Sequence, residues 1–193
     1  MVVKSNFFFS KEECEEIVKL CEKAGITPIH KVDAYNKWDM LRIYDVTIKE
    51  RILKRYKEVF SNDTTLAFDL NDIGLNEIFL SLTRYYDGRF LEVHRDTSSE
   101  LTSVIVLTDD FEDGRFVLSE DKVKIENNTL DENSLYTINQ GNGLTFNGHT
   151  IWHGVMPVHK GIRKSLNIWI EPNSFKIQSG ENQFVVKTQK SFL

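Results

Sequence analysis

Cysteine and proline are scarce in this sequence, and acidic residues outnumber basic ones. Two cysteines among 193 residues are too few for the disulfide framework of a small secreted module. Three prolines and ten glycines exclude a collagen-like chain and a proline-rich linker. A net charge of −5 argues against a protein that works mainly by neutralising nucleic-acid phosphates, so we expect no nucleic-acid partner.

Long apolar runs and a secretory leader are also missing. No run approaches the roughly 18 apolar residues that a membrane-spanning helix requires. The N-terminal stretch lacks the apolar region and cleavage site of a signal peptide, so we expect a cytoplasmic protein with no membrane partner. Cys14 and Cys21 are then two buried thiols. The length and the hydrophobic content of 40% predict a single domain over residues 1–193.

Helical periodicity is confined to the first 70 residues. Ser10 and Glu13 have the spacing of a capping box, and apolar residues then recur every three or four positions up to Gly25. The same spacing predicts a second helix over 47–60. We expect residues 1–70 to be a helical support region, with the phenylalanines 7–9 packing on the core as a short strand or staple.

From residue 71 the pattern changes to short β-like runs separated by clusters of Gly, Asp and Asn. Such a series is typical of an all-β sandwich, jelly roll or barrel. We therefore predict a mainly β protein, with a β core over residues 71–175 and a tail over 176–193 that adds one strand near 184–187. The runs are 78–86, 90–93, 102–108, 115–119, 122–126, 134–139, 143–147, 150–155 and 165–170.

One histidine–acid pair stands out in the β-rich part. His94 and Asp96 are two residues apart, so on a strand both side chains point to the same face. By itself such a pair is common, and the alternative is two surface residues at a strand end. His153, 57 residues beyond Asp96, adds a second imidazole. Two imidazoles and one carboxylate form the facial triad of non-haem Fe(II) oxygenases, whereas zinc favours closed tetrahedral sites or a helical H-E-x-x-H motif.

A second polar group lies near the end of the β-rich part. If 163–170 is a strand, Arg163, Ser165, Asn167 and Trp169 share one face, and mostly apolar residues share the other. An inward guanidinium is costly unless it meets an anion, and it matches a carboxylate with two hydrogen bonds. The alternative is an outward arginine on a solvated face, but the bulky Trp169 on the same side suits a pocket wall better.

These residues stand in motifs that resemble those of the prolyl 4-hydroxylase-like Fe(II)/2-oxoglutarate dioxygenases. Residues 85–88 (YYDG), followed by His94 and Asp96, resemble that family's Y-x-x-G…H-x-D signature. The block from His153 to Trp169 resembles its H-x-V-x-P-V-x-x-G-x-R-x-S-L-x-x-W pattern. Between them, 111–116 and 143–146 stand where the family has a Gly-Gly-Glu-Leu turn and a strand from Gly to Phe. The resemblance covers residues 78–171 in the right order.

The resemblance implies a double-stranded β-helix, a distorted cupin-like jelly roll whose N-terminal helices support one sheet. It also implies Fe(II), the cosubstrate 2-oxoglutarate and O2, with ascorbate as a further candidate. The acid in the motif favours hydroxylation over halogenation, because related halogenases carry a small residue there. In this sequence the implied iron ligands are His94, Asp96 and His153. The implied 2-oxoglutarate site consists of Arg163 on the distal carboxylate, Tyr85 as a helper, and Ser165, Asn167 and Trp169.

Three functions remain open for the chain. The first is hydroxylation of an unactivated C–H bond in a prolyl residue of a peptide or protein. The second is the same chemistry on a free amino acid or other small molecule, and the third is a non-catalytic binding module. The third is disfavoured because the three implied iron ligands and the Arg163 anchor are all present. Two departures bear on the substrate: 113–116 (DGRF) replaces the Gly-Gly-Glu-Leu turn, and Leu91 stands where an aromatic residue is frequent.

The cleft separates the first two functions, because an open groove suits a peptide and a lidded cavity suits a small molecule. We expect the lid or groove wall in residues 33–38 and 60–71. His149 is expected in a turn, with a contact to the site as the alternative, His159 faces solvent, and His30 has no evident partner. Four arginines fall around the expected pocket mouth, as surface charges or, alternatively, as a recognition site for an acidic substrate: Arg84, Arg89, Arg95 and Arg115.

Overall fold

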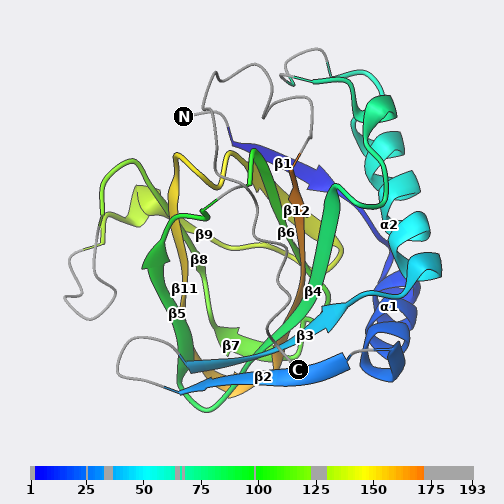
Figure 1. Cartoon of the computed structure of the whole chain (residues 1–193). Helices are drawn as coiled ribbons and strands as arrows, with labels where there is room; N and C mark the ends of the chain where they lie inside the picture. The colour runs from blue at the N-terminus through cyan, green and yellow to red at the C-terminus, as the bar shows by residue number, and fades with distance from the viewer. Residues whose placement is uncertain are drawn as a thin grey trace.

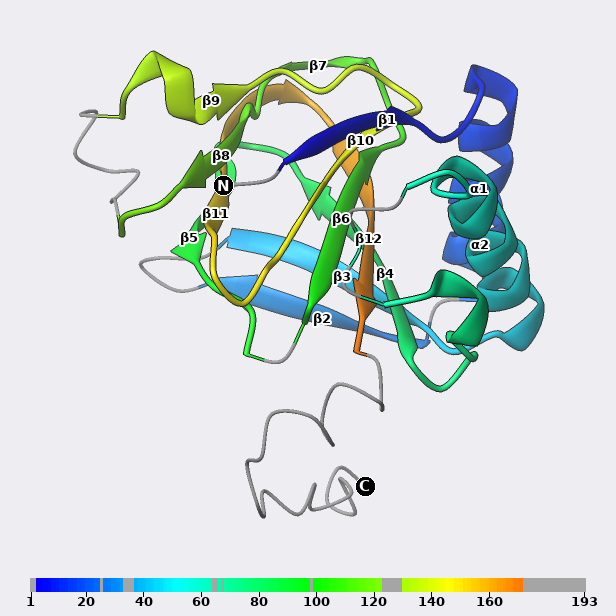
Figure 2. The same cartoon turned by 90° about the horizontal axis from the view of Figure 1, so that it is seen from above.

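Two antiparallel sheets face each other, and two helices pack against the outside of the larger sheet (Figures 1 and 2). The computed structural model describes residues 3–24, 26–32, 37–63, 66, 68–97, 99–122 and 130–171. The larger sheet has the order β1 (Lys4–Phe7), β10 (Asn142–Phe146), β6 (Leu101–Val106), β12 (Arg163–Ile170), β4 (Ile78–Tyr85), β3 (Lys37–Ile43) and β2 (Ile26–Val32). The smaller has the order β5 (Arg89–His94), β11 (Trp152–Gly161), β8 (Phe116–Ser119) and β9 (Leu135–Tyr136), with β7 (Phe111–Asp113) also paired to β11. This is the predicted double-stranded β-helix.

Helix α1 (Lys11–Ala24) begins at the predicted capping box. The backbone N–H of Ser10 donates to Glu13 Oε2 at 2.8 Å, and the N–H of Glu13 donates to Ser10 Oγ at 3.3 Å. The apolar positions read from the sequence form its buried face: Cys14, Ile17, Val18 and Cys21. Burial raises the pKa of the Cys14 thiol to about 11 and that of Cys21 to about 12, so both cysteines are inert structural thiols as expected.

Helix α2 (Val46–Val59) matches the second predicted helix to within one residue. Asp45 caps its N-terminus by accepting a hydrogen bond from Ile48 N at 3.0 Å. Both helices contact β4, and their buried faces join one core with the outer face of the larger sheet. Among the described residues, neither helix is long and apolar enough to cross a membrane. The described residues also include two single turns of 3-10 helix, η1 (Leu70–Asp72) and η3 (Glu132–Ser134).

The first 70 residues are not purely helical, because they also contribute β1, β2 and β3 to the larger sheet. Phe8 and Phe9 are buried as expected, whereas Phe7 is exposed on β1. The strand expected at 184–187 lies outside the described residues, as does most of the one expected at 122–126. The side chain of His30 in β2 is likewise not described.

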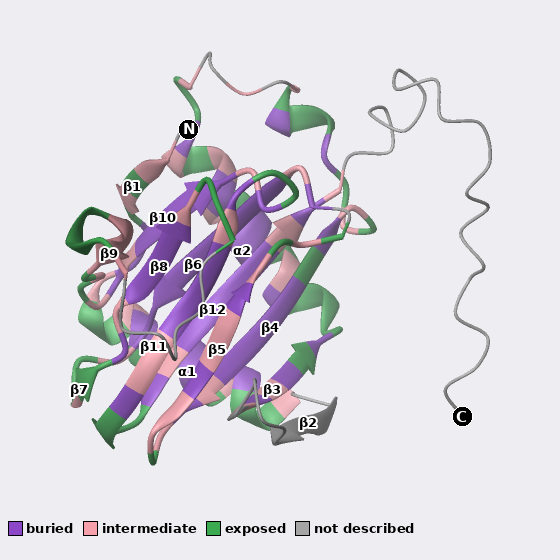
Figure 3. Cartoon of the chain, turned by 90° about the vertical axis from the view of Figure 1, so that its left-hand side faces the viewer, coloured by how far each residue is buried: buried purple, intermediate pink, exposed green. Residues whose placement is uncertain are grey.

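Strand β12 confirms the predicted alternation, and this alternation places the polar residues between the two sheets. It lies between β4 and β6 near the middle of the larger sheet. Leu166, Ile168 and Ile170 belong to the core under the helices. Arg163 and Ser165 are buried at 1% exposure on the opposite face. In Figure 3 the buried residues are concentrated along the central strands, and the exposed residues lie mostly in turns.

Candidate active site

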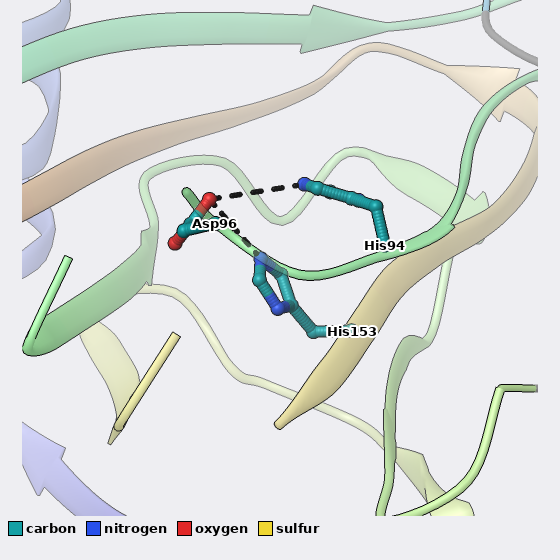
Figure 4. A group of neighbouring side chains, drawn as sticks. All are labelled: His94, Asp96 and His153. Carbon is teal, nitrogen blue, oxygen red and sulfur yellow. Dashed lines mark ion pairs between the residues drawn. The ribbon is translucent and has the colours of Figure 1, made fainter. Parts of the chain in front are cut away.

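The three predicted metal ligands lie side by side at one end of the smaller sheet (Figure 4). His94 ends β5, Asp96 follows two residues later, and His153 faces His94 across the β5–β11 pairing. The Nε2 atoms of His94 and His153 lie 3.9 and 3.7 Å from Asp96 Oδ1. Because the three ligand atoms lie within 4.8 Å of one another, one metal ion could bind all three and keep further positions open.

Both imidazoles are oriented by backbone carbonyl groups. Nδ1 of His94 lies 3.0 Å from the carbonyl oxygen of Glu92, and Nδ1 of His153 lies 3.0 Å from that of Ile151. A proton on each Nδ1 leaves each Nε2 with a free lone pair. A carbonyl partner of this kind fixes the tautomer and ring orientation of a metal-bound histidine.

The Asp96 carboxylate has one occupied oxygen and one oxygen that faces the histidines. Its Oδ2 accepts hydrogen bonds from Thr102 Oγ1 at 2.6 Å and from Trp169 Nε1 at 3.1 Å. Gly148 provides the room for this arrangement, because a Cβ there would lie 2.2 Å from Thr102 Oγ1 and 2.3 Å from Asp96 Oδ2. Oδ1 is therefore the oxygen left for a metal.

His153 is the most deeply buried of the three ligands, at 4% exposure. Phe116 and Phe146 flank its ring, with centroids 6.2 and 4.9 Å away. Burial first, and then the neighbouring His94, lower the pKa of His153 to about 4. The imidazole is therefore neutral at physiological pH, which is the form that binds metals.

Arg163 has the properties expected of a carboxylate-binding residue. It is buried, its Nη1 donates to Ser165 Oγ at 3.2 Å, and its Nη2 is buried with no hydrogen-bond partner among the described residues. Its Cζ lies 5.6 Å from the centroid of the Tyr85 ring. Burial lowers the pKa of Arg163 to about 10, so the guanidinium stays charged at neutral pH. A buried cation with an unused donor fits an anionic ligand such as 2-oxoglutarate.

A cavity of about 540 Å³ opens beside the three ligands. Its floor includes alternate side chains of two neighbouring strands: Trp38, Met40, Arg42 and Tyr44 along and just after β3, and Phe79, Ser81, Thr83 and Tyr85 along β4. The predicted site residues that line it are Tyr85, His94, Asp96, Asn167 and Trp169. The other three, His153, Arg163 and Ser165, are buried and do not line it.

Several residues of this region escaped the sequence analysis. Thr102 and Gly148 orient Asp96. Trp38, the last residue of the expected groove wall 33–38, does line the cavity, and its indole N–H is buried with no partner among the described residues. Asn167, predicted as a 2-oxoglutarate contact, donates to the hydroxyls of Ser81 and Thr83. No sequence motif marks Thr102, Gly148, Ser81 or Thr83, because their role depends on strand register.

The other histidines and loops considered in the sequence analysis lie mostly away from the cavity. His149 is exposed in a turn, as expected, and His159 is exposed with Nε2 4.0 Å from Asp113. Residues 33–36 lie outside the described residues, and Trp38 belongs to β3. The described part of 60–71 lines a separate surface hollow and none of the cavity beside the ligands, so no lid is found there.

None of the four candidate arginines lines the cavity. Arg84 and Arg89 pair with Asp39 at 3.6 and 2.5 Å. Arg115 pairs with Glu132 at 2.7 Å, and Arg95 lies over the ring of Trp152 at 4.4 Å. These contacts favour structural and surface roles over substrate recognition.

Comparisons with known proteins agree with this geometry. Residues 80–171 match the family model of the 2OG-Fe(II) oxygenase superfamily, and no curated protein sequence matches the chain. A viral collagen prolyl hydroxylase of Paramecium Bursaria Chlorella virus-1, solved with 2OG, has a TM-score of 0.63 at 16% identity, covering 88% of this chain and 96% of its own. A Pseudomonas putida prolyl-4-hydroxylase has a TM-score of 0.63 at 13% identity, covering 88% of this chain and 91% of its own.

A third solved structure is a Trichoplax adhaerens prolyl hydroxylase in complex with a hypoxia inducible factor peptide. Its TM-score is 0.57 at 13% identity, and the match covers 94% of this chain and 87% of its own. At these identities the likeness shows the fold. The chain therefore has the fold of these prolyl hydroxylases, and its residues 80–171, which carry the His-Asp-His cluster, match the 2OG-Fe(II) oxygenase superfamily in sequence.

Proposed function

We propose that this protein is an Fe(II)- and 2-oxoglutarate-dependent dioxygenase that hydroxylates an unactivated C–H bond of a prolyl residue in a peptide or protein. The observation that supports the dioxygenase chemistry is that the two oxygens of the Asp96 carboxylate have different surroundings. Its Oδ2 is held by Thr102 and Trp169, and its Oδ1 is turned toward two free Nε2 atoms. We further propose that one catalytic domain spans the chain.

In this proposal His94, Asp96 and His153 bind the iron through Nε2, Oδ1 and Nε2. Iron and 2-oxoglutarate, when bound, supply the O2-dependent oxidation of a C–H bond, with succinate and CO2 as coproducts. The chain contributes geometry and polarity. The carbonyls of Glu92 and Ile151 hold the tautomers, and the rings of Phe116 and Phe146 keep water from the buried side of His153.

Arg163 binds the distal carboxylate of 2-oxoglutarate through its unused Nη2, with the Ser165 hydroxyl fixing the guanidinium. Tyr85, Asn167 and Trp169 line the adjoining cavity. Because Arg163 is held between buried groups, it needs little reorganisation when the anion arrives, which favours tight and oriented binding. Ascorbate acts as an auxiliary reductant in this proposal.

The length of the cavity supports a peptide rather than a free amino acid. Trp38 and Tyr44 both line it, and they are six positions apart along extended backbone, roughly 20 Å at 3.3 Å per residue. The cosubstrate would occupy the end near Tyr85 and leave the other end for several residues of an extended peptide. The named neighbours, which are prolyl hydroxylases, favour proline as the target. Hydroxylation of a free amino acid or other small molecule is the second candidate, because the cavity volume also falls in the range of small-molecule sites.

The test is succinate formation from 2-oxoglutarate by protein that is loaded with Fe(II) without oxygen and then exposed to air, with ascorbate present. A proline-rich peptide and a pool of free amino acids are offered separately. His153→Ala and Arg163→Ala should abolish iron-dependent turnover, while His149→Ala and Arg115→Ala serve as matched controls outside the cavity. The pool that stimulates succinate formation chooses between the two substrates. Failure to bind any metal would overturn the ligand assignment and favour a non-catalytic binding module.

A further inference from the structure

The end of the cavity that lies away from Tyr85 is aromatic and exposed. We call it the aromatic end, and it consists of Arg42, Tyr44, Lys49 and Phe79. Tyr44 and Phe79 are exposed at 57% and 46%, although both are large apolar side chains. Exposed aromatic side chains at the mouth of a site are typical of surfaces that bind a partner.

Two cationic side chains lie at this end, Lys49 and Arg42, and among the described residues only Lys49 already has a partner. Lys49 donates to the carbonyl of Leu75 and lies 5.9 Å from the centroid of the Phe79 ring. Arg42 is exposed and, within the part of the chain that the structure describes, makes no ion pair or side-chain hydrogen bond. The acid at this end, Glu171, has an interaction of its own. Arg42 therefore offers an unused guanidinium beside an aromatic surface.

The strand register sets the distance between Arg42 and the metal ligands. Arg42, Ser81 and Asn167 are Cα partners on three adjacent strands, so Arg42 lies two strands, roughly 10 Å, from Asn167. Trp169, two residues after Asn167, donates to Asp96. An extended peptide with its target residue at the iron would thus reach Arg42 after two or three residues.

We propose that Arg42, Tyr44 and Phe79 form a subsite that binds an acidic side chain of the peptide substrate, two or three residues from the oxidised residue. The inference rests on the proposed function, and it names the sequence preference of that function. Arg42 provides a bidentate partner for a carboxylate, and the two rings cover the apolar part of the peptide. The four arginines considered from the sequence do not line the cavity, so Arg42 takes the role that they were candidates for.

The test uses three proline-centred peptides that differ only at the second and third positions on both sides, with Glu, Gln or Lys. Binding is measured by fluorescence anisotropy without oxygen, in the presence of Fe(II) and 2-oxoglutarate, and succinate formation is measured in air. Wild type should bind the Glu peptide roughly fivefold more tightly than the Gln peptide, and the Lys peptide should bind worst. Arg42→Glu should reverse this order.

Arg115→Glu is the matched control, since it makes the same charge change outside the cavity at a cation paired with Glu132. It should keep the order of wild type. Two results would overturn the subsite: equal binding of the three peptides by wild type, or an unchanged order of peptide affinities in Arg42→Glu. Succinate formation stimulated by a peptide would still support the proposed function in either case. Binding of none of the peptides would overturn both the subsite and the peptide substrate.

Discussion

Each residue that we assign to the metal has one atom tied to the protein and one atom left over. The two histidines use Nδ1 for a carbonyl, and Asp96 uses Oδ2 for Thr102 and Trp169. The sequence predicted that His94, Asp96 and His153 lie together, because they stand in several motifs at matching spacing. It could not predict Thr102 or Gly148, since a lone threonine or glycine carries no signal until the strands bring it beside Asp96.

The hydrogen bonds to Asp96 predict how the metal affinity responds to substitution. Trp169→Phe and Thr102→Val each remove one donor to Oδ2 and keep most of the side-chain volume. We expect Mn(II) or Fe(II) to bind roughly tenfold more weakly to each variant, measured by anaerobic titration of the apoprotein. Trp152→Phe is the control, because the Trp152 ring faces Arg95 and gives no bond to Asp96. Unchanged affinity in both variants would show that Asp96 needs no such orientation.

His153 predicts a loss of stability of the metal-free protein in acid. Its pKa is lowered from 6.5 to about 4, mainly by burial, so the unfolded chain takes up a proton at a higher pH than the folded one. The folded state thus keeps its full stability above pH 6.5, where His153 is neutral in both states, and loses stability as the pH falls toward 4. We expect a decrease of roughly 2 kcal/mol over this window, measured by urea unfolding in chelator. His153→Gln should flatten this part of the profile, and an equally steep profile in the variant would refute the assignment.

At the scale of elements, the strength of the periodicity decides what the sequence reveals. The α1 capping box and the alternation of β12 are complete signals, and both were predicted correctly. Strand β3 lies between the two helices in the sequence. It was missed because Asp39 stands on its buried face and interrupts the alternation of apolar and polar residues. This buried acid is tolerable only because Arg84, Arg89 and Tyr86 surround it.

This cluster ties β3 to the β4–β5 turn, and it predicts a stability effect. Asp39 is exposed at 2%, accepts from Tyr86 Oη at 2.8 Å and pairs with Arg89. Asp39→Asn keeps the shape but leaves two partly buried guanidinium groups without their anion, so unfolding should become easier by about 2 kcal/mol. Glu132→Gln breaks the exposed pair with Arg115 and should change stability by less than about 0.5 kcal/mol. Equal effects in urea titrations would mean that burial adds nothing to the Asp39 cluster.

At the scale of the whole molecule, the two sheets enclose the site and the helices support only the outer face. The proposed metal ligands come from the smaller sheet and the loop after β5, whereas Arg163, Trp169 and the cavity floor come from the larger one. Sequence motifs predicted that these residues share one site, because each of the two motifs includes a strand of either sheet. They could not predict the cavity's length or its aromatic end, since these depend on β3 lying beside β4.

Because the site spans both sheets, the metal should stabilise the fold, and 2-oxoglutarate should stabilise it further once the metal is bound. Mn(II) at about 100 times its Kd adds about 2.7 kcal/mol, which for a chain of this size raises Tm by roughly 5–10 °C, and chelator should reverse the shift. Adding 2-oxoglutarate should raise Tm again. Arg163→Ala should keep the metal shift and lose most of the second shift. His153→Ala should lose both, because 2-oxoglutarate binds largely through the metal. If the protein is one domain, circular dichroism and tryptophan fluorescence will give the same Tm in every state, and two separate transitions would divide the sheets into independent units.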